Sequence, residues 1–201
     1  MLRVEALTRL GLGPFDFEVA DGECLAITGP SGAGKSVLLR AIADLDPNEG
    51  RVFSGRFERA SVAAPDWRRA VALLPAESGW WADDVAAHFR EPDAQGAMLA
   101  AVGLDADAIA WQVARLSTGE RHRLALLRAL EQAPDVMLLD EPTTMLDPET
   151  TALVEAVLKA RMARGLSIVM VTHDPEQPAR IATRIMRLEA GRLHAAHGRA
   201  G

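Results

Sequence analysis

Gly29-Pro30-Ser31-Gly32-Ala33-Gly34-Lys35-Ser36 decides the fold, because it matches the phosphate-loop pattern G-x-x-x-x-G-K-[S/T]. An apolar run at Glu23–Thr28 precedes it and is typical of a buried strand. Lys35–Asp44 follows, with apolar residues at helical spacing. A strand, a glycine-rich turn and a helix in this order present backbone N–H groups to phosphate. The sequence therefore predicts a nucleotide site within an α/β fold.

Each residue type in this loop has a chemical reason. Gly29, Gly32 and Gly34 allow the backbone to curl without Cβ clashes. We expect Lys35 to bridge the β- and γ-phosphates and the Ser36 hydroxyl to ligate Mg²⁺. The whole octapeptide is thus a predicted nucleotide-binding segment, including Pro30, Ser31 and Ala33. A small-molecule kinase would share this loop.

Outward from the loop, short apolar runs alternate with helical patterns. Strands are predicted at Val71–Leu74, Val136–Leu139 and Ser167–Thr172, a helix at Pro148–Ala163, and a closing hairpin at 185–193. Residues 82–132 are Ala-rich and predicted to be helical. This alternation favours a mostly parallel sheet with an inserted helical region. We expect one domain over 1–201, with its core in 1–75 and 134–201 and a helical subdomain in approximately 76–133.

Composition excludes several protein classes. The 201 residues are 49% hydrophobic and 25% charged with a mean hydropathy of +0.03, which excludes a disordered chain. No apolar run approaches the about 20 residues of a membrane span, and no secretory signal is visible. A single cysteine, Cys24, fits a reducing cytosol. The net charge of −6 disfavours nucleic acid as a partner.

A second acidic motif ends the predicted strand at Val136–Leu139. Asp140 follows the strand directly, and a carboxylate at that edge is suited to hold Mg²⁺. Glu141 comes next, and we expect it to point toward the γ-phosphate and polarise an attacking water. Besides a nucleotide site, an ordinary strand running into a solvated acidic turn remains an alternative for this pair.

Between these motifs lies Leu116-Ser117-Thr118-Gly119-Glu120, which resembles the LSGGQ signature of ATP-binding-cassette (ABC) ATPases. The order of the three motifs resembles that family over almost the whole chain. The resemblance implies a P-loop NTPase (RecA-like) core with an antiparallel N-terminal β region and an inserted helical subdomain. It also implies that two cassettes sandwich ATP, with Ser117, Thr118, Gly119 and Glu120 facing the partner's nucleotide. Ser117 or Thr118 is also suited to cap the following helix.

Further positions match the family residue by residue. Asp147 resembles the D-loop aspartate at the interface between cassettes, and it is also placed to cap the helix that begins at Pro148. His173 resembles the switch histidine that contacts the γ-phosphate, which with Lys35 and Glu141 completes the expected catalytic set. His194 and His197 are too few for a metal site, and we expect a solvated end there.

Besides mild departures from the signature at Thr118 and Glu120, two further features differ from the family pattern. Ala76 stands where the Q-loop glutamine is expected, and neighbouring Glu77 is a hypothetical substitute for it. The region that normally supplies an adenine-stacking aromatic offers only Phe15 and Phe17, so stacking is uncertain and base selectivity is expected to be loose.

The resemblance implies the ATPase subunit of an ABC transporter, of the short single-cassette type. Its implied cofactors are ATP and Mg²⁺, and its partners a membrane permease and a second cassette, with a homodimer favoured. We expect it at the cytosolic face of the cell membrane. Trp80 and Trp81 are candidates for the permease contact, although packing inside the helical region is the alternative. A non-transport ABC ATPase or a weakly active nucleotide switch also remains open.

Overall fold

Two β-sheets organise residues 1–196, the part of the chain that the computed structural model describes. The larger sheet has the strand order β10-β9-β3-β8-β7-β6, in which only the β9–β10 hairpin is antiparallel. Its strands are β3 (Cys24–Thr28), β6 (Val71–Leu74), β7 (Val136–Asp140), β8 (Ser167–Val171), β9 (Arg184–Glu189) and β10 (Arg192–Ala195). The predicted parallel sheet and closing hairpin are therefore confirmed.

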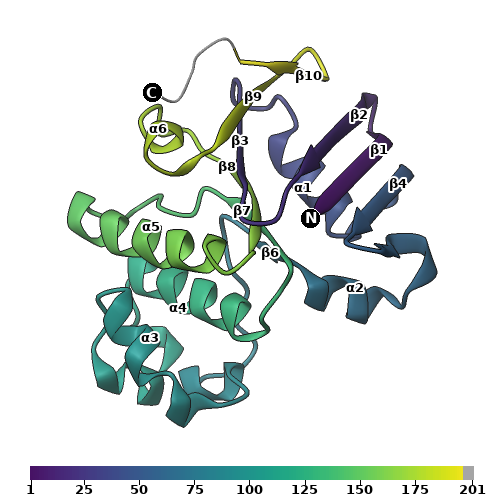
Figure 1. The fold of residues 1–201 in the computed structure, drawn as a ribbon. Coiled ribbons are helices and arrows are strands. Elements are labelled where there is room, and N and C mark those ends of the chain that lie inside the picture. The colour runs from purple at the N-terminus through teal and green to yellow at the C-terminus, as the bar shows by residue number, and fades with distance from the viewer. Residues whose placement is uncertain (197–201) are drawn as a thin grey trace.

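The smaller sheet is antiparallel and has the order β2-β1-β4-β5. Its strands are β1 (Leu2–Arg9), β2 (Leu12–Val19), β4 (Glu49–Ser54) and β5 (Phe57–Glu58). Helix α1 (Lys35–Ile42) lies between this sheet and the larger one (Figure 1). The antiparallel N-terminal region expected from the resemblance is thus present.

Alternate side chains of the main-sheet strands point to opposite faces, and both faces are covered. Within β7, Val136 and Leu138 face the cluster shared with α1 and the N-terminal sheet, whereas Met137 and Leu139 face the helices on the other side. All four are fully buried, as expected for a parallel strand with helices on both faces.

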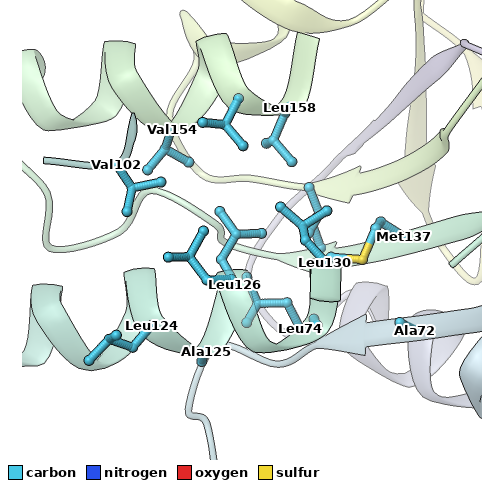
Figure 2. Close-up of a cluster of buried hydrophobic side chains, with 14 of the residues drawn as sticks. Ala72, Leu74, Val102, Leu124, Ala125, Leu126, Leu130, Met137, Val154 and Leu158 are labelled. Carbon is cyan, nitrogen blue, oxygen red and sulfur yellow. The ribbon is translucent and has the colours of Figure 1, made fainter. Parts of the chain in front are cut away.

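The second face is covered by helices α4 (Thr118–Glu131) and α5 (Pro148–Met162). Figure 2 shows Val154 and Leu158 of α5 directed toward Leu126 and Leu130 of α4. Burying these aliphatic side chains supplies most of the driving force for this packing, at about 1.5–3 kcal/mol for each one. The remaining helices are α2 (Ala64–Ala70), α3 (Gly96–Ala101) and α6 (Gln177–Ile181).

The prediction of a helical region over 82–132 needs correction. Only α3 and α4 are α-helices there, and the rest of the region consists of short 3₁₀ turns and irregular segments. These turns are Val85–His88, Pro92–Ala94, Ala106–Ala110 and Val113–Arg115, with a further turn outside the region at Arg59–Ser61. Pro92, Gly96 and Gly103 interrupt the alanine runs before long helices form.

Candidate functional site

The glycine-rich loop connects β3 to α1 at the carboxyl edge of the main sheet. A Cβ at Gly29, whose φ is +143°, would lie 2.2 Å from the backbone oxygen of Leu188 on β9. A Cβ at Gly34 would meet the Leu12 side chain at 2.3 Å, whereas one at Gly32 would meet nothing within 4 Å. The loop is therefore packed from behind by β9 and β2 and open above Gly32. Glycine is required here by close packing as well as by positive φ.

Lys35 is folded back over this loop. Its Nζ donates to the carbonyl oxygens of Gly29 at 2.8 Å and Pro30 at 2.9 Å. The residue is 5% exposed, and burial lowers the pKa of its ammonium, while Glu141 and Asp140 nearby oppose that shift. An ammonium held between neutral carbonyls keeps its charge available for an anion above the loop.

Asp140 ends β7 beside Ser36, the first-turn residue of α1. Burial raises the pKa of the Asp140 carboxyl, Glu141 raises it further, and a hydrogen bond with the Ser36 side chain opposes the shift, as do Lys35 and His173. A buried carboxylate next to a hydroxyl is a set of hard oxygen donors, which fits Mg²⁺ better than a softer metal.

Glu141 occupies a strained position directly after β7. Its φ is +55°, and its N–H donates to the Val171 carbonyl at 2.8 Å. His173 Nε2 lies 3.2 Å from one carboxylate oxygen, and the Thr144 hydroxyl donates to the other at 2.8 Å. Strain of this kind persists only where neighbouring contacts fix the residue. The structure therefore brings Lys35, Asp140, Glu141 and His173 together, as predicted.

The segment after His173 is held by a network that the sequence did not indicate. Arg180 Nη2 donates to Asp174 at 2.7 Å, and Arg180 Nε donates to buried Glu155 on α5 at 3.0 Å. These bonds raise the pKa of the Arg180 guanidinium and lower the pKa of Asp174.

A second tie joins α6 to the segment after Glu141. Gln177, fully buried, donates from Nε2 to Thr143 Oγ1 at 2.8 Å. A glutamine buried at the start of a short helix indicates a side-chain hydrogen bond, but the sequence does not identify the partner, which lies 34 residues earlier.

Ser117 begins α4 with a capping box. Its hydroxyl accepts from the Glu120 N–H at 3.3 Å, and the Ser117 N–H donates to Glu120 Oε2 at 2.8 Å. The predicted capping role is confirmed for Ser117 rather than Thr118. In the described residues no hydrogen bond or ion pair joins Ser117, Thr118, Gly119 or Glu120 to the glycine-rich loop.

Asp147 caps α5, because its Oδ1 accepts from the Thr150 N–H at 2.9 Å and Pro148 occupies the first turn. The neighbouring Met145 is 75% exposed with a φ of +68°. A Cβ at Gly119 would lie 3.2 Å from Leu146, so the start of α4 lies against this segment.

Neither aromatic candidate for adenine stacking is accessible. Phe15 is 1% exposed and Phe17 7%, because alternate residues of β2 point into the core between the two sheets. Leu10, in the turn between β1 and β2, is 72% exposed. It lies two residues before Leu12, whose side chain packs on Gly34 of the loop.

The two adjacent tryptophans have different surroundings. Trp81 is 71% exposed, whereas Trp80 packs against the helical cluster. The Arg128 guanidinium lies 4.8 Å from the Trp81 ring and 5.0 Å from the Trp80 ring. His88 Nε2 accepts from the backbone N–H of Trp81 at 3.1 Å. Hollows of about 280 and 310 Å³ flank Trp81 and Arg128. Trp80 therefore packs in the helical region, as the alternative expected, whereas Trp81 is exposed and its contact with a permease stays a prediction.

The remaining candidates are the histidines near the C-terminus and any membrane-spanning helix. In residues 1–196 no group of three or more metal-ligating side chains is assembled, and His194 lies exposed on β10. His197 lies outside the described residues. None of the helices in that range has the length and apolar character needed to cross a bilayer.

Comparison with known proteins agrees with this geometry. Residues 12–144 match the family model described as ABC transporter. The chain is 35% identical to Protein STAR1 of Oryza sativa subsp. japonica, over 96% of the chain but 61% of that protein. It is 37% identical to the aliphatic sulfonates import ATP-binding protein SsuB 2 of Mesorhizobium japonicum, over 97% of the chain and 80% of that protein. A dimeric ATP-binding cassette solved in a post-hydrolysis state with ADP and phosphate shares its fold, with a TM-score of 0.77, 23% identity and coverage of 98% and 100%.

Proposed function

The chain belongs to the ABC transporter family, and from that premise we propose that it binds and hydrolyses ATP to drive a membrane permease. The observation that carries the proposal is the meeting of Lys35, Asp140, Glu141 and His173 at one edge of the sheet. These residues come from three separate segments of the chain. A structural role alone does not require two neighbouring carboxylates beside a buried lysine and a glycine cradle.

We propose that the triphosphate lies over the cradle, with Lys35 leaving the Gly29 and Pro30 carbonyls to contact the β- and γ-phosphates. Ser36 and Asp140 are the residues that would hold Mg²⁺, which when bound neutralises charge developing on the phosphate oxygens. Leu10 offers an apolar surface to the base in place of an aromatic ring, which fits a preference for ATP that is less strict than stacking would give.

Glu141 is the proposed general base. A water oxygen attacks the γ-phosphorus, its proton passes to the Glu141 carboxylate, and the bond to the bridging oxygen breaks to leave ADP and phosphate. His173, 3.2 Å from that carboxylate, holds it in position and is placed to contact the γ-phosphate. The Thr144 hydroxyl occupies one oxygen of the Glu141 carboxylate. Glu141 must therefore either release that hydroxyl or accept the water proton on its other oxygen alone.

The second half of the site is proposed to come from a partner cassette. The start of α4 exposes Ser117, and a helix N-terminus attracts an anion. Within one chain Ser117 makes no bond to the glycine-rich loop, so a second copy would have to bring it to the γ-phosphate. Asp147 and exposed Met145 lie in the segment beside α4 and are proposed to contact that partner. A cassette of the same fold forms a dimer with ADP and phosphate, which supports this assembly.

The permease contact is assigned to Trp81 rather than Trp80. Trp81 stands exposed between two hollows, and its ring is fixed by Arg128 and His88. An aromatic that is both rigid and exposed is suited to anchor a partner. The chain would then lie at the cytosolic face of the membrane, with 1–75 and 134–201 acting as the nucleotide core and 76–133 as the permease-facing subdomain.

The experiment is steady-state hydrolysis of Mg-ATP by the wild-type chain and Glu141→Gln. The account expects the variant to lose about 10²-fold or more in kcat with its ATP affinity little changed, because the substitution removes the base and keeps the shape. Equal kcat values would overturn the assignment of Glu141.

Ala76 favours a second candidate, a nucleotide switch with little turnover, because alanine lacks the polar atoms that the family's glutamine supplies. The same assay separates the two, since a switch binds ATP without measurable hydrolysis. If Glu77 substitutes for the glutamine, Glu77→Ala should lose most activity and Ala76→Gln should keep it. The reverse result would remove that role.

A further inference from the structure

The loop that carries His173 has few contacts of its own. Residues 172–176 follow β8 and belong to no helix or strand. The His173 side chain is 48% exposed, and within residues 1–196 the Glu141 carboxylate, at 3.2 Å, is the one that pairs with its ring. The position of the ring therefore depends on how the backbone of this loop is held.

Two hydrogen bonds shape the loop locally. The Asp174 N–H donates to Thr172 Oγ1 at 3.0 Å, and Asp174 Oδ1 accepts from the Glu176 N–H at 2.8 Å. Each bond joins residues two positions apart. Both therefore fix the shape of the turn but not its place relative to the rest of the chain.

Arg180 of α6 supplies a long-range connection. Its Nη2 donates to Asp174 Oδ2 at 2.7 Å and lies 3.0 Å from Glu155 Oε1, and its Nε donates to that same Glu155 oxygen at 3.0 Å. Glu155 is 4% exposed and lies on α5, which packs against the main sheet. A guanidinium is planar and its N–H groups point in fixed directions, so it holds the two carboxylates in one geometry. Asp174 is thereby connected to a buried residue of α5.

The need to neutralise Glu155 explains only part of this arrangement. A buried carboxylate requires a partner of opposite charge, and the contacts between Arg180 and Glu155 meet that requirement. The contact with Asp174 is different, because the side chains of Arg180 and Asp174 are 36% and 38% exposed. An ion pair with that exposure adds little to stability. Its evident effect is on the position of the loop.

We propose that Arg180 is a positioning residue for ATP hydrolysis, which through Asp174 holds His173 against the Glu141 carboxylate. This rests on the proposed function, in which Glu141 takes the proton of the attacking water. In residues 1–196 neither Arg180 nor Asp174 makes a hydrogen bond to the glycine-rich loop. Loss of their contact should therefore lower kcat and leave the KM for ATP unchanged.

Asp174→Asn is the variant that breaks the contact alone. Its amide oxygen still accepts from the Glu176 N–H, while its NH₂ faces the guanidinium and cannot accept from it. The Arg180–Glu155 pair is kept, so no buried carboxylate loses its partner. Glu176→Gln is the matched control, because it makes the same change on a side chain that is 84% exposed and 3.8 Å from the same guanidinium.

The first measurement is steady-state hydrolysis of Mg-ATP by the full-length chain. A displacement of a catalytic group by about 1 Å can cost up to about 10²-fold in rate, so Asp174→Asn should lower kcat at least about tenfold. Its KM should stay within about twofold of the wild-type value, and Glu176→Gln should change neither constant by more than that.

The second measurement uses no nucleotide. In a ¹⁵N-histidine-labelled full-length chain, the Nε2 resonance of His173 senses the Glu141 carboxylate, so Glu141→Gln should shift it. That shift should disappear in the Asp174→Asn background and remain in the Glu176→Gln background. A role of Asp174 in stability alone would leave the shift in place in both.

Three results would overturn the proposal. An unchanged kcat in Asp174→Asn, with Glu141→Gln inactive, would leave the proposed function standing without this role for Arg180. An equal loss of kcat in Glu176→Gln would show a general effect of surface charge. A Glu141→Gln shift that persists in the Asp174→Asn background would show that the contact does not position His173. A wild-type chain that binds ATP without hydrolysing it would instead refute the proposed function, and the resonance would still decide what holds His173.

Discussion

Gly29→Ala and Gly32→Ala form a matched pair, because both replace a glycine of the same loop at positive φ. A Cβ at residue 29 would lie 2.2 Å from the Leu188 backbone oxygen, whereas one at residue 32 would touch nothing. Gly32→Ala should therefore cost only the strain of a left-handed residue, about 1–2 kcal/mol. For a chain of this size that lowers Tm by about 2–8 °C.

Gly29→Ala must in addition displace either the loop or strand β9, since the clashing atom is backbone and has no rotamer to change. We expect its unfolding free energy to fall by about 4 kcal/mol or more, in the range reserved for severe local clashes. Thermal unfolding followed by circular dichroism measures both variants. A Gly29→Ala Tm within about 4 °C of that of Gly32→Ala would refute the packing of this loop on β9.

Gly32→Ala, which should lose less stability, also tests the role of the loop in nucleotide binding. Gly32→Ala should fold yet bind ATP at least about tenfold more weakly, because alanine disfavours the left-handed conformation that aims the loop N–H groups together. Calorimetric titration with Mg-ATP gives the dissociation constant. Wild-type affinity in Gly32→Ala would contradict the phosphate cradle itself.

The remaining predictions concern other parts of the chain. Trp81→Ala should change Tm by less than about 2 °C because the ring is exposed, whereas Trp80→Ala should cost about 2–3 kcal/mol; similar losses would contradict their different burial. Burial raises the pKa of Cys24 to about 12, so mass spectrometry should find no alkylation by iodoacetamide at pH 8 until urea unfolds the chain. Bonds from Ser117 hold the Glu120 pKa below its usual value, so this capping contribution is complete above pH 4.5 and is lost as the pH falls through the lowered folded pKa. Glu120→Gln should flatten that acid limb in urea unfolding, and an unchanged limb would show that Glu120 does not cause it.

Much of the fold follows from local pattern. The strand before the glycine-rich loop, the helix after it and the acidic end of β7 are each encoded within a few residues, and the structure has them as predicted. The secondary structure of residues 82–132 was harder to predict. Their alanine content favours helix, while prolines and glycines interrupt the alanine-rich runs with turns.

The residues of the candidate site also divide into those that a local motif reveals and those whose surroundings depend on the fold. Lys35, Ser36 and Asp140 were found because they belong to contiguous motifs. Stacking by Phe15 or Phe17 was left uncertain, and the alternation of Phe15, Phe17 and Val19 indicates one buried face of β2.

The roles of Gln177 and Arg180 could not be read from sequence. Their partners are the Thr143 hydroxyl and the Glu155 carboxylate, which tertiary packing alone brings near. Buried polar side chains of this kind look like ordinary helix residues until their neighbours are known.

The central claim is that one chain carries half of each ATP site and that its helix start completes the site of a twin. The most direct measurement is the mass of Glu141→Gln in solution, by light scattering, with and without saturating Mg-ATP. The account predicts a monomer without nucleotide and a stable dimer with it, which a further Ser117→Arg substitution abolishes. A Glu141→Gln chain that binds ATP and stays monomeric would contradict it.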